Sequence, residues 1–243
     1  MTLLDLTLPS PAENLALDEA LLDAAEAGER GEVLRFWESP TPFVVVGYAN
    51  KIAAEVNVAA CEAKGIPILR RCTGGGTVVQ GPGCLNYALI LRINETGPTR
   101  SISSANQFIM ERNLAAIASL NPQPPTLDLS IRGHTDLALG DLKFSGNAQR
   151  RRKQFLLFHG TFLHSFDLSL INQLLHMPSA QPDYRDNRAH DAFVTNLKLS
   201  PVSIRGVIAK TWDAVANSLA PPLQSTALLV REKYSQAEWN RKF

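Results

Sequence analysis

A glycine-rich stretch that follows two arginines is the first candidate for chemistry in this sequence. Residues 70–87 read RRCTGGGTVVQGPGCLNY. Glycines let the backbone approach a ligand closely, and successive free N–H groups can hold an anion. Because side chains alternate along a strand, we expect only one of the two arginines to reach a bound ligand; a plain tight turn is the alternative. The residues concerned are Arg70, Arg71, Gly74, Gly75, Gly76 and Thr77.

A lysine among small residues is the second candidate. Residues 134–150 read HTDLALGDLKFSGNAQR, with Lys143 on a predicted strand. Lysine on a strand is most often a solvated side chain, but the small residues after this one leave room for a ligand. Asp136 precedes it and could hold a hydroxyl group or a Mg²⁺-bound water. The small residues are Ser145, Gly146 and Ala148.

A histidine and the cysteines are the remaining candidates. His159 and Gly160 stand in an apolar run, FHGTFLH, where a hydrogen-bonded core histidine is the alternative to a catalytic one. Cys61, Cys72 and Cys84 fit neither a CxxC metal site nor a small disulfide framework. We therefore expect reduced thiols, as in a cytoplasmic protein.

Helices and short strands are expected to position these residues. Ser10, Pro11 and Glu13 predict a helix start with a capping box, and Asn57 predicts the cap of a short helix. Strands and helices mix without a strict βαβ rhythm, which favours an α+β fold with mixed or antiparallel sheets over a Rossmann-like fold. The other expected elements are strands at 33–38, 43–48, 66–71 and 85–93, a β-rich section from Thr126 to His164, and helices at 101–120, 167–175, 202–219 and from Thr226 onward.

Composition excludes several classes of protein. The chain has 243 residues, 45% of them hydrophobic, and a formal net charge of +1, so bulk charge argues against a nucleic-acid-binding protein. Neither a basic leader nor a long apolar segment occurs, so we expect a cytoplasmic protein without a membrane span. No stretch is rich enough in proline, glycine or serine to act as a linker, so a single domain over residues 1–243 is expected.

The order of the motifs is more specific than any one of them. Along the chain stand RRxxGGGxV, Gly-x-Leu-Asn-Tyr, an Asp-Leu pair, Lys-x-Ser-Gly-x-Ala, His-Gly-Thr-x-Leu and Val-Thr-Asn-Leu, after NLALDEALL near the start. This order resembles the lipoate–protein ligase and octanoyltransferase family over about residues 10–220. The resemblance implies the α+β catalytic domain that these enzymes share with biotin–protein ligases.

The resemblance also implies a site and a reaction. Lys143 would contact the acyl carbonyl and the adenylate phosphate, Asp136 would lie near the nucleotide and its Mg²⁺, and His159 would line the same pocket. Lipoate or octanoate and ATP would form an acyl-adenylate, which a lysine of an acceptor domain would attack. The implied acceptors are an H-like protein of glycine cleavage or an E2 domain of a 2-oxoacid dehydrogenase. The other implied binding residues are Arg70, Arg71, Gly74, Gly75, Gly76, Thr77, Cys84, Asn86, Ser145, Gly146, Ala148 and Gly160.

The sequence departs from the ligase pattern in ways that keep alternatives open. Gln80 stands where ligases often have histidine, Cys84 replaces a frequent asparagine, and no accessory domain follows the catalytic one, so a separate accessory polypeptide is a further expected partner. Octanoyltransferases form a thioester on a cysteine, and this chain has none after Lys143. We therefore expect a ligase. A transferase acting through a Cys84 thioester and a non-catalytic lipoyl-binding protein are the alternatives.

Overall fold

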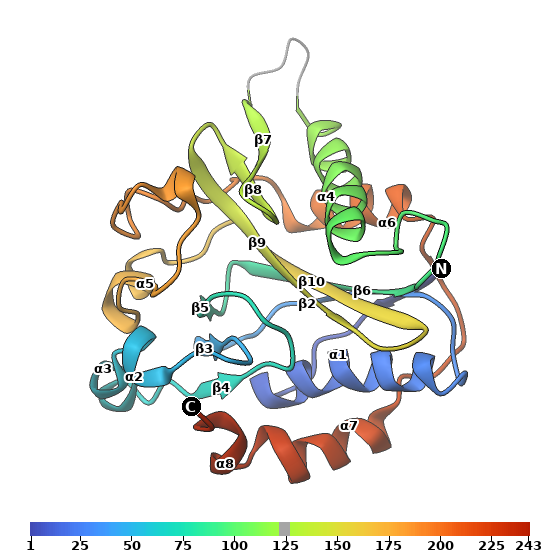
Figure 1. Cartoon of the computed structure of the whole chain (residues 1–243), viewed down its shortest axis with the longest axis horizontal. Helices are drawn as coiled ribbons and strands as arrows, with labels where there is room; N and C mark the ends of the chain where they lie inside the picture. The colour runs from blue at the N-terminus through green and yellow to red at the C-terminus, as the bar shows by residue number, and fades with distance from the viewer. Residues whose placement is uncertain (122–126) are drawn as a thin grey trace.

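A mixed sheet of eight strands runs through the middle of the molecule (Figure 1). The computed structural model describes residues 1–121 and 127–243. The strand order is β11-β1-β2-β6-β10-β9-β8-β7; β1 runs parallel to both of its neighbours, and the pairs from β2 to β7 are antiparallel. The strands are β1 (Thr2–Asp5), β2 (Val33–Trp37), β6 (Cys84–Arg92), β7 (Leu129–Arg132), β8 (Asp136–Leu139), β9 (Leu142–Arg151), β10 (Phe155–Leu163) and β11 (Val215–Ala216).

A second sheet of three strands, in the order β4-β3-β5, lies beside the first. Strand β3 (Phe43–Val46) pairs in parallel with β4 (Ile68–Arg70) and antiparallel with β5 (Val78–Gln80). The glycine-rich stretch is therefore the connection from β4 to β5. This places the glycines at one end of the small sheet.

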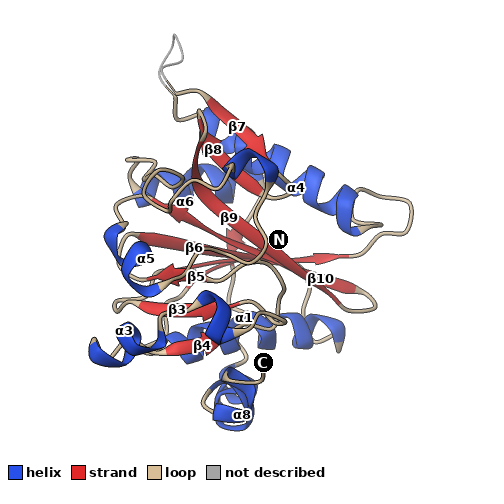
Figure 2. Ribbon diagram, turned by 60° about the vertical axis from the view of Figure 1, so that its left-hand side comes forward, coloured by secondary structure: helices blue, strands red, loops and turns tan. Residues whose placement is uncertain are grey.

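Helices cover both faces of the large sheet (Figure 2). Helices α4 and α6 lie on one side of it, and α1 lies on the other with the C-terminal helices beneath it. The helices are α1 (Pro11–Glu26), α2 (Ile52–Glu55), α3 (Val58–Ala63), α4 (Ile102–Ala118), α5 (Ser169–Leu174), α6 (Pro201–Thr211), α7 (Leu223–Leu229) and α8 (Ala237–Asn240), with a 3₁₀ turn at Asp183–Arg185 and a π-helical turn at Val230–Tyr234.

The hydrophobic core is divided by the large sheet. On one side, Ile109 of α4 and Ile204 of α6 pack with Phe158 of β10. On the other, Leu17 and Leu21 of α1 pack with strands β2, β6 and β10. Burying apolar surface on both faces fixes the strand register, because a slip by one residue would send each side chain to the wrong face.

Several local predictions are confirmed. The α+β class and the mixed sheet are as expected. The Ser10 side chain accepts a hydrogen bond from the Glu13 backbone, and the Glu13 side chain accepts one from the Ser10 backbone, so the capping box is present. Asn57 caps α3 by accepting from the Ala60 backbone. These contacts are short-range, and residue type alone specifies them.

Other local predictions were wrong or incomplete. The helix expected over 202–219 ends at Thr211, because Asp213 takes a left-handed conformation with φ 47° and turns the chain. Residues of β11 then join the large sheet beside β1. The sequence patterns missed β1, α2 and β5, whose lengths are too short to show a period. Thr126, expected to open the β-rich section, lies outside the described residues.

Candidate active site

A cavity of about 920 Å³ opens between the sheets and collects most of the predicted residues. Its walls come from β8, β9 and β10, from the glycine-rich connection, and from the segment over residues 176–194. The predicted residues on its lining are Arg71, Gly75, Gly76, Thr77, Asn86, Asp136, Lys143, Ser145, Gly146, Ala148, His159 and Gly160.

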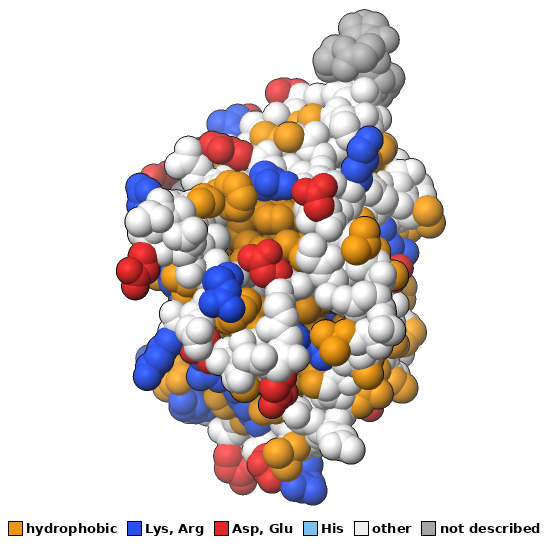
Figure 3. Space-filling model, turned by 90° about the vertical axis from the view of Figure 1, so that its right-hand side faces the viewer, with side chains coloured by type: hydrophobic (Ala, Val, Ile, Leu, Met, Phe, Trp, Pro, Cys, Tyr) orange, Lys and Arg blue, Asp and Glu red, His pale blue; other side chains and the backbone are white. Residues whose placement is uncertain are grey.

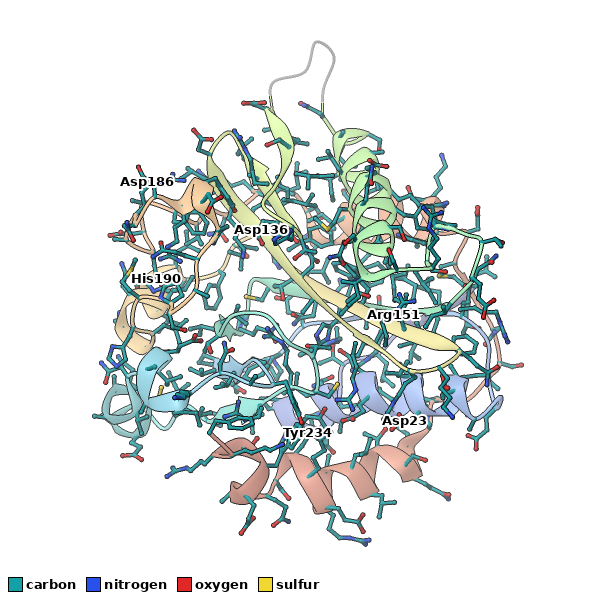
Figure 4. All side chains as sticks on the ribbon, viewed as in Figure 1. Asp23, Asp136, Arg151, Asp186, His190 and Tyr234 are labelled. Carbon is teal, nitrogen blue, oxygen red and sulfur yellow. The ribbon has the colours of Figure 1, made fainter. Side chains whose placement is uncertain are left out.

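Lys143 and Asp136 form an ion pair on one wall. The distance from Lys143 Nζ to Asp136 Oδ1 is 2.8 Å, and the two side chains are 25% and 12% exposed. Tyr184, from the 3₁₀ turn, donates a hydrogen bond of 2.8 Å to Asp136 Oδ2. Figure 4 shows Asp136 beside the loop that carries Asp186 and His190. Burial, and then the neighbouring Asp136, raise the pKa of Tyr184, so its hydroxyl stays protonated and can donate.

Glycine at position 146 makes room for the lysine. A Cβ there would lie 2.8 Å from both Lys143 Cε and Nζ, so any other residue would force the end of the lysine side chain to move. The backbone around Lys143 is also fixed, since its N–H donates to Phe193 O and its carbonyl accepts from Thr195 N. The ammonium group is thereby held at the cavity wall, where it can meet negative charge on a carbonyl or phosphoryl oxygen.

Arg71 shapes the glycine-rich connection on the opposite wall. Its guanidinium donates to Gly74 O at 2.6 Å and to Gly76 O at 2.7 Å. Gly75 has φ +84°, and a Cβ there would lie 2.9 Å from Arg71 Nη2, so the turn requires glycine. Burial lowers the pKa of Arg71 to about 10, which still leaves it charged at neutral pH. Gly74 itself lies outside the cavity lining.

Arg70 does not line the cavity, contrary to its predicted place among the binding residues. It is fully buried, and its Nη1 donates to the carbonyls of Gly47, Tyr48 and Asn50. Two residues of the C-terminal segment hold its backbone: Asn240 Oδ1 accepts from Arg70 N, and Trp239 Nε1 donates to Arg70 O. The strand alternation that sends Arg71 to the cavity sends Arg70 away from it.

His159 is held by two buried residues at the base of the cavity. Its Nε2 lies 2.7 Å from Thr73 Oγ1, and its Nδ1 lies 3.4 Å from Asp18 Oδ2. Asp18 also forms a 2.5 Å ion pair with Arg35, which is fully buried. The histidine thus links α1, β10 and the start of the glycine-rich connection.

Part of the cavity lining is apolar. It includes Leu15, Val45, Val79 and Leu163, together with the ring of Trp37. A short polar chain crosses it: Gln80 Nε2 donates to Thr161 Oγ1 at 3.0 Å, and Thr161 donates to Asn86 Oδ1 at 2.6 Å. Gln80, which stands in place of the expected histidine, therefore serves as a donor within the wall.

The cysteines lie away from the cavity. All three are described and buried, and none is on the lining. Cys84, predicted as a lining residue, is fully buried among the apolar side chains of Val44, Val79 and Phe166, because β6 turns it toward the small sheet. Burial raises the pKa of Cys84 and raises the pKa of Cys72 to about 12. Such thiols are protonated and poor nucleophiles at neutral pH.

Two other features were considered as sites: clusters of metal-ligating side chains and a second cavity. The described residues contain no group of three or more His, Cys, Asp or Glu side chains that could hold a metal. Asp136, the predicted Mg²⁺ ligand, is a single carboxylate whose two oxygens contact Lys143 and Tyr184; Mg²⁺ that is bound to phosphates often meets a protein through one or two carboxylates. Figure 3 shows an apolar hollow on the face that carries the N-terminus. The cavity there has a volume of about 470 Å³, and Met1, Phe108 and Trp212 are among its lining residues. None of the predicted site residues lies on this lining.

Three residues that line the cavity were missed from the sequence. Asp18 belongs to the quoted NLALDEALL run but was not singled out there. Glu55 ends a four-residue helix and lines the cavity. Tyr184 stands in a polar loop with no periodic pattern. For Asp18, an acid inside an otherwise apolar helix face was the available signal; for the other two, the contacts are long-range.

The motifs whose residues line this cavity lie within a family match that covers most of the chain. The family model of the lipoyl protein ligase A/B catalytic domain matches residues 10–216. The chain belongs to this family. Across the described residues, no helix is long and apolar enough to cross a membrane.

Relatives in the lipoyl protein ligase family carry two kinds of name. Octanoyltransferase LipM of Brevibacillus brevis is 26% identical, with 95% of each chain covered. A crystal structure of lipoate-protein ligase A bound with ATP is 25% identical, with TM-score 0.80 and 99% and 98% of the two chains covered. A bi-partite lipoate protein ligase, studied with its E2 lipoyl domain from Thermoplasma acidophilum, has TM-score 0.82 at 23% identity, with 99% and 95% covered, and shows the shared fold.

Proposed function

We propose that this protein is an ATP-dependent lipoate–protein ligase. One observation carries the proposal: the cavity brings Lys143 and Asp136 together, and its lining contains no cysteine that could form a thioester. An acyl-adenylate route needs charge stabilisation on the acyl carbonyl and the phosphate, but no protein nucleophile. The relative bound with ATP supports the use of this nucleotide.

In the first step, the carboxylate of lipoate or octanoate attacks the α-phosphorus of ATP. A bond forms between the carboxylate oxygen and phosphorus, and pyrophosphate leaves. Lys143 neutralises the charge that gathers on the phosphoryl and carbonyl oxygens, and Gly75 and Gly76 of the glycine-rich connection line the same cavity. Mg²⁺ would supply phosphate neutralisation, with Asp136 as the ligand from this chain.

In the second step, the amine of an acceptor lysine attacks the acyl carbon of the adenylate. An amide bond forms, the bond from the acyl carbon to the phosphate oxygen breaks, AMP leaves, and the amine loses a proton. The apolar residues of the cavity lining would keep the acyl chain and the mixed anhydride away from water, which would hydrolyse the anhydride.

The acceptor and any helper protein belong to the same proposal. The Thermoplasma relative was studied with an E2 lipoyl domain, and it is a bi-partite ligase. We propose a lipoyl-type acceptor domain for this chain, a single catalytic domain over residues 1–243, and assistance by a separate accessory polypeptide.

The change in mass of an acceptor domain, measured with and without ATP, tests the ligase mechanism. Incubation with lipoate and ATP is expected to add one lipoyl group, and omission of ATP is expected to prevent this. A lipoate-dependent exchange of label between pyrophosphate and ATP would report the first step alone. The absence of both signals, with or without a candidate accessory polypeptide, would overturn the ligase assignment and favour a non-catalytic lipoyl-binding role.

The second candidate is an octanoyltransferase that uses a Cys84 thioester. The LipM relative favours it. A parallel reaction with octanoyl-carrier protein and no ATP tests this candidate. Acceptor modification under those conditions, lost in Cys84→Ser, would establish the transferase in place of the ligase.

A further inference from the structure

A buried carboxylate outside the predicted site joins two walls of the cavity. Glu55, the last residue of α2, is 4% exposed. Its Oε2 accepts from Asn50 Nδ2 at 2.7 Å and from Thr77 Oγ1 at 2.5 Å, and its Oε1 accepts from Ser179 Oγ at 2.7 Å. One side chain thus receives donors from three separate segments.

The first contact reaches the glycine-rich connection. Thr77 lies directly after the glycines, and Asn50 Nδ2 also donates to Gly75 O at 3.1 Å. Glu55 therefore restrains the end of the turn directly through Thr77, and its middle indirectly through Asn50, while Arg71 holds Gly74 and Gly76. Thr77, which was predicted as a binding residue, donates its hydroxyl to Glu55.

The second contact reaches the segment over residues 176–194. Ser179 is tied to Glu55, and Tyr184 is tied to Asp136, so two carboxylates hold this segment at separate points along the cavity. Arg188 Nη2 adds a bond to Asp141 O in the turn between β8 and β9. Figure 4 shows Asp186 and His190 of this segment on the left of the view, next to Asp136.

Hydrogen bonds to a charged acceptor are stronger than those between neutral groups, and a buried carboxylate is costly when unpaired. Glu55 has a donor on each wall, so neither wall can move away without leaving this charge under-bonded. The arrangement fixes the separation of the two walls before any ligand enters.

We propose that Glu55 is a positioning residue, which holds the glycine-rich connection and the 176–194 segment at the separation that the carboxyl end of the acyl substrate requires. The assignment rests on the proposed function for the identity of that substrate. Glu55 touches no reacting atom in this account. Its effect is on binding of the acid and on the local opening of the two walls.

Three variants separate the two contacts. Glu55→Gln keeps the shape but removes the charge and places an amide group against three donors. Thr77→Val removes only the contact with the glycine-rich connection, and Ser179→Ala removes only the contact with the 176–194 segment. Amide hydrogen exchange of the whole chain and calorimetric titration with lipoate need neither ATP nor turnover, so they report on this assignment independently of the ligase proposal.

Glu55→Gln is expected to speed exchange in residues 74–77 and in residues 177–181 together, and to weaken lipoate binding by about tenfold or more. Thr77→Val and Ser179→Ala are each expected to speed exchange in one wall only. In the ligase assay, KM for lipoate should rise while kcat changes little. Unchanged exchange and unchanged lipoate affinity in Glu55→Gln would overturn the assignment. If that variant does not fold, the same absence of change in Thr77→Val and Ser179→Ala would do so.

Discussion

Two walls of the cavity are built in different ways: the sheet wall, which carries Lys143, and the loop wall, which is the glycine-rich connection with Arg71. Lys143 stands on β9, where pairing with Ala138 of β8 and with residues 193–195 fixes its position. Arg71 stands where β4 has ended, and its turn is fixed by its own guanidinium together with the side chains of Asn50 and Glu55. One wall takes its geometry from strand register, and the other takes it from individual hydrogen bonds.

This difference predicts unequal responses to mutation. A side chain on the sheet wall can be removed with little effect on the backbone, because the ladder remains. A side chain that restrains the glycine-rich connection is part of the geometry itself, so its loss is expected to change both stability and substrate affinity. The predictions below compare the walls, beginning with the largest effect.

Removing the lysine tests the sheet wall. Lys143→Ala is expected to lower acyl transfer by about 10²–10³-fold or more, since a positioned charge donor is lost from the site of developing charge. Thermal unfolding should be little changed. The exposed Lys153→Ala is the matched control and should retain activity. Full transfer activity in Lys143→Ala would remove this residue from the site.

Trp239, which contacts the Arg70 backbone, tests the loop wall. Trp239→Phe leaves the buried Arg70 carbonyl without its donor, which is expected to cost about 1–3 kcal/mol in the free energy of unfolding. It is also expected to raise KM for lipoate, because Arg70 and Arg71 are consecutive. Trp212→Phe, which removes an equivalent donor to Asn113 on α4, is the control. It should lower stability alone; equal KM values in the two variants would contradict the comparison.

Acid titration of Glu55, which holds the loop wall through Thr77, is expected to have a smaller effect on the free energy of unfolding. Burial acts to raise the pKa of Glu55, but hydrogen bonds from Thr77, Ser179 and Asn50 outweigh it and lower that pKa. The contribution to stability is therefore complete above the unfolded-state value of about 4.3 and is lost as pH falls through the lower folded-state value.

The difference in unfolding free energy between the parent and Glu55→Gln should accordingly be largest at neutral pH and shrink below about pH 4. Urea unfolding at a series of pH values measures it. A difference that stays constant into acid would show that Glu55 is not charged in the folded protein.

The smallest effect on activity is expected from the thiols. Cys84→Ala should keep ATP-dependent modification of the acceptor, with a loss of about 1 kcal/mol in stability from the vacated core position. Cys61→Ala is the control, since that thiol is buried in the same apolar cluster. Loss of acyl transfer in Cys84→Ala but not in Cys61→Ala would show that Cys84 takes part in the reaction.

The sequence was most informative where a structural cause is local. The capping box of α1 follows from Ser10 and Glu13, and the strand that carries Lys143 follows from its apolar neighbours. It was least informative where partners are far apart in the chain. Nothing near Arg70 indicates a partner at Asn240, and nothing near Glu55 indicates Ser179. The motifs gathered at the cavity were found, whereas the residues that hold their loops in place were not.

The contacts of Arg70 with Trp239 and Asn240 also bear on self-association. Strand β4 is the edge of the small sheet, and a free edge offers its N–H and C=O groups to another chain. Here an amide oxygen and an indole N–H occupy that edge in place of a neighbouring strand. A mutation that detaches the C-terminal helices would therefore expose β4 to strand pairing with a second copy. The segment that holds Arg70, next to the glycine-rich connection, thus also protects the sheet edge against aggregation.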